Sequence, residues 1–354
     1  MRPPFGTVDL GRLPAPLADT SIISARKNSF CGQLAGLLPS DGLPTGLVQA
    51  LLNLLFPGDL SIDPSTFGFP SQAIIPFRSE KPRTVLEQVL GITSGAGTGV
   101  TIHILDTADQ SGDDFVLRRR PGEPEPFYYD VPLDGRPLHG RVVGEVAKAV
   151  APLAQVQFYK VCSGDGLCRT LDTVQALCAV AQEARQGGRH VVNLSAGGPY
   201  PAVGLKLALA EVAGLGVPTA TSYGNRDDCV GHAPGDQCRH YPADWSPEFV
   251  TSTAPKAPTL LISVAGRDIN PDVEEYATYN RAVVIPWAQT PLPGVQAPGE
   301  FWFAGMPYFG TSFAAPVVSG MLAGWMSCRP GVPFLPLVTA PHQNPLASVV
   351  NACP

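Results

Sequence analysis

The sequence has no long hydrophobic run and no strong charge of either sign. None of its apolar stretches reaches the roughly 18 residues that cross a bilayer, and residues 1–16 lack the apolar segment of a secretory signal. The net charge is −6, from 24 basic and 30 acidic residues. The basic triplet at 118–120 is interpreted as a solvated loop. We therefore expect neither a membrane nor a nucleic-acid partner.

Cysteine is sparse, but its spacing is informative. An even count of eight, mostly in close pairs, favours disulfides and an oxidising compartment. The pairs are Cys162 and Cys168, Cys229 and Cys238, and Cys328 and Cys353. A competing interpretation takes Cys229-x-x-His232 and Cys238-x-His240 as zinc ligands, but these spacings fit no common structural zinc site. We expect an extracellular protein, with the cytoplasm as the alternative because the signal is missing.

Length and composition indicate an ordinary globular protein. The 354 residues, 44% of them hydrophobic, can bury one large core and still supply an extension. Residues 1–75 are Pro-rich, with two short helical patterns, QLAGLL (33–38) and GLVQALLNLLF (46–56). We expect the main domain at 76–335 and a C-terminal tail at 336–354 that a disulfide holds.

Beyond Gly99, apolar strands alternate with helices. The expected strands are GVTIHILD (99–106), QVQFYKV (155–161), HVVNLSAGG (190–198) and VPTATSYGN (217–225). The expected helices are HGRVVGEVAKAV (139–150), LDTVQALCAVAQEARQ (171–186) and VGLKLALAEVAGLG (203–216). Repeated strand-helix-strand units predict an α/β fold, with a largely parallel central sheet and helices on both faces.

Polar residues that close apolar strands are the first candidates for a site, because ligands bind at the C-terminal ends of such strands. Asp106, the Ser195–Gly198 turn and Asn225 stand at these ends. Each also has an ordinary structural role. Asp106 could cap a helix, and Asn225 after a glycine could merely turn the chain. His139 opens a helix after a loop, where a solvated histidine is common.

Ser312 lies in GTSFAAP (310–316), ahead of a long apolar run. Proline is tolerated in the first turn of a helix, so Pro316 predicts a helix that begins at or near Ser312. The hydroxyl could cap that helix. An electrophile held there would also meet free N–H groups and the positive end of the helix dipole. Asp, His and Ser in this order, with an Asn donor between the last two, supply the roles that acyl transfer needs.

With these residues assembled, the chain resembles the subtilases, the subtilisin-like serine peptidases. The similarity covers roughly residues 80–330. The matching motifs are ILDT (104–107), HGRVVGEVA (139–147), VVNLSAGG (191–198), SYGN (222–225) and GTSFAAP (310–316). The resemblance implies a three-layer fold and a serine endopeptidase, with Ser312 as nucleophile, His139 as general base and acid, and Asp106 as the group that orients it. Asn225 would hold the oxyanion.

The resemblance also implies how a substrate binds. Ser195, Ala196 and Gly197 would pair with an extended polypeptide by strand addition. Gly164 to Cys168, including Gly166, would form the opposite edge of the cleft, and Gly224 would line it at the oxyanion turn. By the same resemblance, residues before the core would be either a prosegment, as in secreted relatives, or a simple extension packed on the core.

Some positions depart from the family pattern. Ala108 stands where Gly is usual, and Arg141-Val142 where Thr-His is usual, which changes the cleft entrance more than the chemistry. Arg226 follows the oxyanion Asn, close to the expected primary pocket. We hypothesise that it disfavours basic residues at the cleaved position, by like-charge repulsion.

The rival interpretation is a catalytically inactive subtilisin-like module that binds a peptide or partner. All of the expected catalytic groups are present, which favours the enzyme. We expect a monomer that acts on a polypeptide substrate and requires neither a cofactor nor a metal in its site. Calcium is a candidate structural ion because DTADQSGDD (106–114) offers carboxylates, although its spacing matches no EF-hand.

Overall fold

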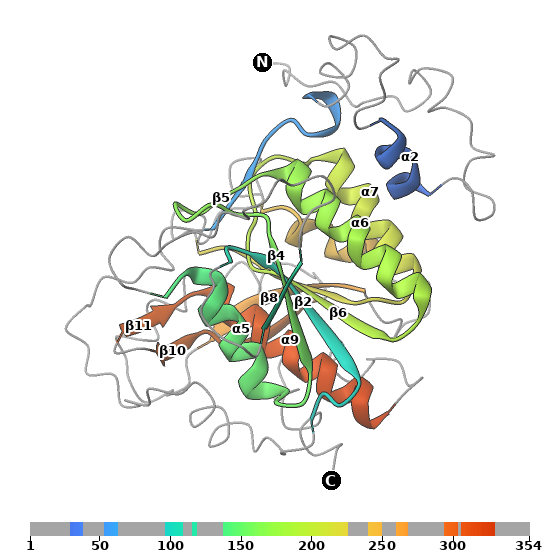
Figure 1. Ribbon diagram of the computed structural model, residues 1–354. Coiled ribbons are helices and arrows are strands. Elements are labelled where there is room, and N and C mark those ends of the chain that lie inside the picture. Colours follow the sequence, from blue (N-terminus) through green and yellow to red (C-terminus); the bar gives the residue numbers. More distant parts are fainter. Residues whose placement is uncertain are drawn as a thin grey trace.

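The structure is a computed structural model, and a parallel sheet forms its centre (Figure 1). The structure describes residues 29–37, 53–62, 96–108, 115–118, 137–225, 240–249, 260–267, 294–303 and 306–329. Within these ranges seven strands pair in parallel, in the order β3-β4-β2-β6-β7-β8-β9. Their bounds are β2 Val100–Asp106, β3 Phe115–Arg118, β4 Gln155–Lys160, β6 Arg189–Leu194, β7 Thr219–Ser222, β8 Leu261–Arg267 and β9 Gly294–Pro298.

Helices cover both faces of the sheet, which confirms the predicted three-layer fold (Figure 1). On one face, α5 (His139–Val150) packs against α9 (Thr311–Cys328). On the other, α6 (Thr170–Gln186) packs against α7 (Val203–Gly214), and α2 (Phe30–Leu37) lies outside them. The 3₁₀ helix η6 spans Ala243–Phe249. Two small antiparallel pairs are β1 (Leu60–Ser61) with β5 (Leu167–Cys168), and β10 (Glu300–Phe303) with β11 (Met306–Phe309).

The core follows from the periodicity of each element. In β2, Val100, Ile102 and Ile104 face α5 and α9, while Leu105 belongs to the core under α6 and α7. In α5 the predicted apolar face is buried: Val142, Val143, Val146, Ala149 and Val150. Because both faces of the sheet are covered, its strands are apolar almost throughout, as parallel strands usually are.

The topology fixes where a ligand site can lie. After β2 the chain forms the edge strand β3 and passes through α5 to β4, which lies between β3 and β2, and then returns through α6 to β6 on the other side of β2. The strand order therefore reverses between β2 and β6. A crevice opens at such a switch point, beyond the C-terminal ends of the strands. Those ends carry Asp106 and Ser195.

Disulfides tie the outer parts to the core. The predicted Cys162–Cys168 bond is present, and a bond between Cys31 and Cys178, which the sequence did not suggest, joins α2 to α6. Cys328 is disulfide-bonded to a residue outside the described ranges, where the Cys229/Cys238 pair also lies. The expected domain boundaries near 75 and 335 fall outside these ranges as well. No helix in the described segments is long and apolar enough to cross a membrane.

Candidate active site

Asp106 and His139 form a buried pair at the switch point. His139 Nδ1 lies 2.9 Å from Asp106 Oδ1 and 3.0 Å from Oδ2, and neither side chain is more than 1% exposed. The Thr107 N–H also donates to Oδ1, at 2.7 Å. Two donors therefore converge on a carboxylate that would be costly to bury alone. The role of Asp106 as a mere helix cap is excluded, because the helix beside it begins at His139 without a side-chain cap.

Gly140 allows α5 to approach β2 this closely. A Cβ at this position would lie 2.1 Å from the Thr107 carbonyl oxygen and 3.0 Å from Asp106 Cβ. The Gly140 N–H instead donates to Thr107 Oγ1 at 2.8 Å. The first turn of α5 is thus docked on the end of β2, and His139 is aimed by backbone packing as well as by its carboxylate.

Ser312 is the second residue of α9, as predicted to within one residue, but it does not cap the helix. Its hydroxyl donates to the Ser195 carbonyl oxygen at 3.2 Å, and the Ser195 hydroxyl donates to the Ser312 carbonyl oxygen at 2.7 Å. The ring of the next residue, Phe313, lies 5.2 Å from the ring of His139. Ser312 therefore contacts the end of the predicted substrate strand, and the residue that follows it lies beside the imidazole.

Pro316 lies in the second turn of α9 rather than in the first, which corrects the sequence prediction. It has no N–H, so it cannot donate to the carbonyl of Ser312, four residues earlier. The Ser195 hydroxyl supplies the missing donor. The proline thus leaves the Ser312 carbonyl without a donor inside the helix. The hydrogen bond from Ser195, directly after β6, then holds the start of α9 in place.

A chain of buried polar groups extends this contact, and the sequence analysis missed it. Asn193 Nδ2 donates to Ser195 Oγ at 2.9 Å, and the Ser319 hydroxyl donates to Asn193 Oδ1 at 3.0 Å. All three residues are fully buried. Such networks specify one arrangement when every member is satisfied. This network sets the position of α9, and with it Ser312, relative to the end of β6.

Asn225 follows β7 and meets the start of α9. Its Oδ1 accepts the Thr311 N–H at 2.8 Å and the Thr311 hydroxyl at 2.9 Å. Because a backbone N–H can only donate, the atom facing Thr311 must be the amide oxygen. The NH₂ group of Asn225 therefore points away from Thr311. This side chain does more than turn the chain, because it fixes both the helix end and the direction of its own donor group.

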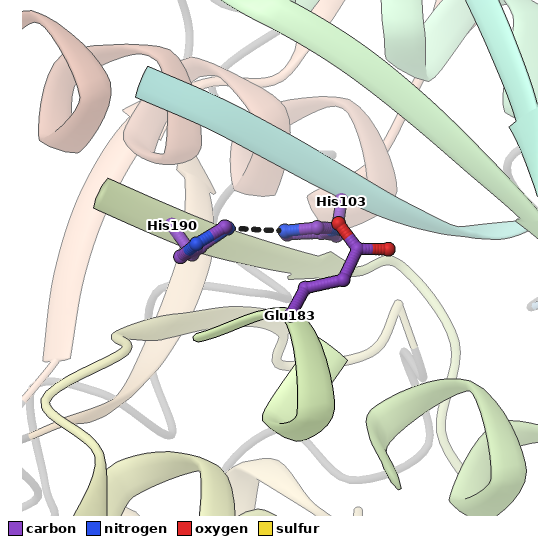
Figure 2. A group of neighbouring side chains, drawn as sticks. All are labelled: His103, Glu183 and His190. Atoms are coloured by element: carbon purple, nitrogen blue, oxygen red, sulfur yellow. Dashed lines mark hydrogen bonds between the residues drawn. The ribbon is translucent and has the colours of Figure 1, made fainter. Parts of the chain in front are cut away.

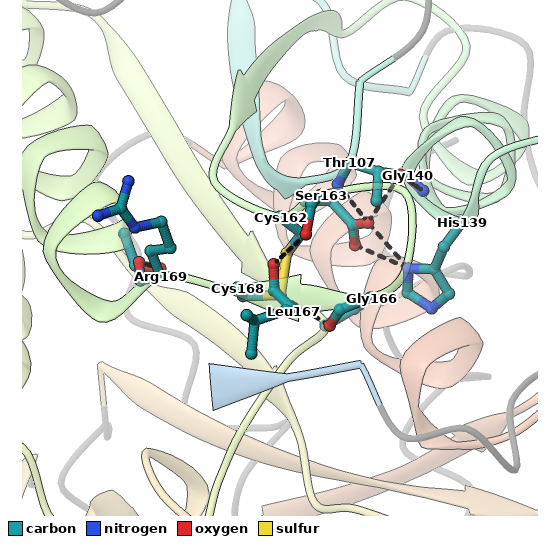
Figure 3. The surroundings of a disulfide bond; sticks show 12 residues. Thr107, His139, Gly140, Cys162, Ser163, Gly166, Leu167, Cys168 and Arg169 are labelled. Atoms are coloured by element: carbon teal, nitrogen blue, oxygen red, sulfur yellow. Dashed lines mark hydrogen bonds and ion pairs between the residues drawn. A yellow bond between two sulfur atoms is a disulfide. The ribbon is translucent and has the colours of Figure 1, made fainter. Parts of the chain in front are cut away.

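The predicted edges of the cleft face each other across β1. Gly197 and Ser61 exchange backbone bonds of 2.9 and 3.1 Å, and the Ile62 N–H donates to the Gly166 carbonyl at 2.8 Å. The 162–168 loop is closed by the Cys162–Cys168 disulfide (Figure 3). The pairing is antiparallel, so the chain after Ser61 advances towards Ser195 and Ser312. A segment of the N-terminal part thus lies where the resemblance implies a substrate strand.

Hydrogen bonds also stiffen the 162–168 loop. The Ser163 N–H donates to the Leu167 carbonyl at 2.9 Å, and the Gly166 N–H donates to the Ser163 carbonyl at 2.9 Å. The Ser163 hydroxyl also donates to Asp165, and this bond, followed by the Leu167 N–H, lowers the pKa of the Asp165 carboxyl. The loop is therefore a preformed edge, held by a covalent bond and by its own polar groups.

The sequence analysis considered His240 only as a zinc ligand and did not place it in the cleft. A Cβ at Gly197 would lie 2.1 Å from its Nε2, and a Cβ at Gly224 would lie 2.8 Å from its Nδ1. The next residue, Tyr241, exchanges backbone bonds of 2.8 and 2.9 Å with Gly198. The imidazole therefore fills the space between two glycines that were predicted to bind substrate.

For a peptide bound as the resemblance to subtilases implies, His240 would limit the size of the residue accepted before the cleaved bond. In a His240→Ala variant, we expect kcat/KM for peptides with a large aromatic residue there to rise about tenfold relative to peptides with alanine. A series of peptide substrates measures the ratio. An unchanged ratio in a folded variant would contradict the assignment.

The remaining predicted residues are placed as follows. Ala108 is buried, and Arg141 forms an ion pair with Glu145 along α5. Arg226 and positions 109–114 of the carboxylate-rich segment lie outside the described residues. The Arg226 hypothesis and the calcium suggestion therefore remain predictions.

Comparisons with known proteins point to one family. The model of the Subtilase family matches residues 137–339. Subtilisin BL of Lederbergia lenta is 27% identical over 242 residues, which cover 64% of this chain and 76% of that protein. M-protease of Shouchella clausii and Subtilisin Savinase of Lederbergia lenta are each 26% identical over 64% of this chain, covering 54% and 76% of their own lengths. The family match begins just before His139, so it leaves out the strand that carries Asp106.

Proposed function

The chain belongs to the subtilase family and is a serine endopeptidase, and we propose that it cleaves peptide bonds through an acyl-enzyme on Ser312. The observation that carries this proposal is the buried Asp106–His139 pair beside the start of α9. A structural serine in that position would need no oriented imidazole. Family membership alone does not assign Asp106, because the family match begins after it.

In the proposed mechanism, Ser312 Oγ leaves its bond to the Ser195 carbonyl and attacks the substrate carbonyl carbon while His139 Nε2 takes its proton. Asp106 accepts the Nδ1–H and stabilises the imidazolium that forms. The Asn225 NH₂ group and the Ser312 N–H donate to the oxyanion, aided by the N-terminal end of α9. His139 then protonates the leaving amine, and water hydrolyses the ester by the same steps. Asp106, His139, Asn225 and Ser312 all belong to this chain, and the proposed steps use no other group.

A fluorophosphonate probe tests the nucleophile. We expect covalent labelling at Ser312, located by peptide mass analysis, and no labelling in a Ser312→Ala variant or after denaturation. If folded protein stays unlabelled but still binds peptides, the inactive binding module becomes the better description. We also propose export, because the two described disulfides need an oxidising compartment to form.

We further propose that residues 58–62 block the cleft from within. Ser61 and Ile62 make three backbone bonds to the two cleft edges. Asp59 Oδ1 accepts the Thr170 N–H at 3.0 Å, at the start of α6, and Phe56 packs against Gly204 of α7. The segment is therefore also anchored on α6 and α7 just before the strand that enters the cleft.

A matched pair of variants tests whether β1 competes with substrate or only packs on the core. Ser61→Pro removes the N–H that donates to the Gly197 carbonyl, whereas Ser61→Ala keeps it and loses only the hydroxyl. One backbone bond is worth about 0.5–1.5 kcal/mol. We expect initial kcat/KM for a short peptide to be about three- to tenfold higher in Ser61→Pro than in Ser61→Ala. Equal rates would show that β1 does not compete with substrate, whether or not Ser312 is the nucleophile.

The Cys31–Cys178 disulfide determines what cleavage of the chain by its own active site would release. If the protein cuts itself between Ile62 and Ala96, the N-terminal fragment stays covalently attached to α6. After long incubation at neutral pH, we expect one species without reductant and two species with it, the larger starting at about residues 63–85. Release of a free fragment without reductant would contradict the tether, and an uncut chain would favour a permanent extension.

A further inference from the structure

A second polar cluster lies beneath α6, away from the active-site groups. It consists of His103 in the middle of β2, His190 near the start of β6, and Glu183 on α6 (Figure 2). His103 is fully buried, His190 is 7% exposed and Glu183 is half-buried. The neighbouring side chains on this face, among them Leu105 and Val192, belong to the apolar core. Two imidazoles in such a layer are costly unless they gain specific partners.

The hydrogen bonds fix the protons of the two rings. His190 Nε2 lies 3.0 Å from the Gly187 carbonyl oxygen, which can only accept, so this nitrogen carries a hydrogen. In the neutral ring, Nδ1 then presents its lone pair. His103 Nε2 lies 2.9 Å from that atom and supplies the hydrogen between them. His103 Nε2 and His190 Nδ1 thus share one hydrogen.

Glu183 completes a set of three converging groups. One ligand atom from each of the three residues lies within 4.8 Å of the others, and Figure 2 shows the carboxylate reaching from α6 to the ring of His103. The Tyr159 hydroxyl donates to Glu183 Oε1 at 2.9 Å and holds the carboxylate in place. A histidine that donates its second N–H to a carbonyl, beside a hydrogen-bonded carboxylate, is the outer arrangement typical of metal sites.

We propose that His103, His190 and Glu183 bind a zinc ion. Two imidazole nitrogens and one carboxylate oxygen are a ligand set that zinc accepts. The ion takes the place of the proton between the rings, and His103 shifts its hydrogen to Nδ1. Tetrahedral zinc with bonds of about 2.0–2.1 Å separates two nitrogens by about 3.3 Å, so the rings need to move apart only slightly from their 2.9 Å contact. Water completes the shell from the side of Glu183, the more exposed ligand.

The position of the cluster gives the ion a structural role. His103 lies three residues before Asp106 on β2, and His190 lies five residues before Ser195 on β6. Glu183 lies on α6, which begins directly after the disulfide-closed cleft edge. Zinc would therefore join the three elements whose ends form the cleft, without touching the reacting atoms.

Zinc binding is tested on the full chain in a Ser312→Ala background, which prevents self-digestion. After removal of metals with a chelator, we expect titration calorimetry to give one zinc per chain, a rise in Tm with zinc, and visible absorption bands of a tetrahedral site with Co²⁺. His190→Gln should abolish binding, while Glu183→Gln and Tyr159→Phe should each weaken it about tenfold or more. Glu145→Gln, which removes a half-buried carboxylate from α5, serves as the control. This variant should bind zinc normally.

Two results would overturn the proposal. One is the absence of zinc binding at micromolar concentrations in the folded protein. The other is binding that survives both Glu183→Gln and Tyr159→Phe but disappears in His139→Gln, which would assign the metal to the active-site imidazole. Glu183 is half-buried and Tyr159→Phe removes only a hydroxyl, so these two variants keep the test decisive even if His190→Gln does not fold.

Discussion

Replacing Asp106 with asparagine should lower kcat about 10⁴-fold while leaving KM nearly unchanged, the size found for the same change in another serine-protease fold. The reason lies in the hydrogen bonds of this carboxylate. The Thr107 N–H donates to Oδ1 at 2.7 Å, so an asparagine must keep its oxygen there. The oxygen then still lies 2.9 Å from His139 Nδ1, but the NH₂ group takes the position of Oδ2, 3.0 Å from the same nitrogen. A donor in that place favours the tautomer with the hydrogen on Nε2, which cannot accept the proton of Ser312.

Steady-state kinetics with one peptide substrate checks this prediction, with thermal unfolding to verify the fold. Glu145→Gln, on the same helix as His139, is the control and should keep normal kcat. A loss of less than tenfold in a folded Asp106→Asn enzyme would show that the carboxylate does not set the tautomer of His139. A large rise in KM at constant kcat would show that it acts on substrate binding instead.

The layers of the fold could be predicted because their patterns are local. HGRVVGEVAKAV repeats its apolar positions at helical spacing, and QVQFYK is a short buried run between helices. The strand β9, GVQAP, gives no such signal because it is short and Gly and Pro are poor strand formers. It is held by its pairing with β8 at one end of the described sheet, and proline is tolerated on an edge strand.

The site could be predicted only where its chemistry appears at the ends of elements. Asp106, His139, Asn225 and Ser312 stand at such ends, and their order along the chain carries information. Asn193, His103 and His190 do not stand out, because each lies inside an apolar strand and meets its partners only in three dimensions.

The same limit applies to the segments before the core. The strand β1 has two residues, and its partners at Leu167 and Gly197 are more than a hundred positions away. The Cys31–Cys178 bond spans 147 residues, so close spacing could not reveal it. Pairings of this kind depend on which surfaces the finished fold brings together, and no local pattern encodes them.

Replacing Asn225 with alanine should lower kcat by about 10²–10³-fold, a magnitude measured for the corresponding donor in a subtilisin rather than derived from this geometry. Two effects are mixed in that variant. The oxyanion loses the NH₂ group, and the Thr311 N–H loses its acceptor at the start of α9. The second effect should cost about 1–3 kcal/mol of stability, because a buried donor is left unpaired. It could also displace Ser312, the next residue.

Asn225→Asp separates the two effects. Aspartate keeps an oxygen for Thr311 and adds a charge that favours the N-terminal end of α9, so Tm should stay close to that of the parent. It has no NH₂ group and places negative charge beside the oxyanion, so kcat should fall at least as far as in Asn225→Ala. Paired measurements of kcat and Tm decide between the roles. If kcat and Tm of Asn225→Asp both equalled those of the parent, the asparagine would act by holding α9. The donor to the oxyanion would then have to be the Ser312 N–H alone.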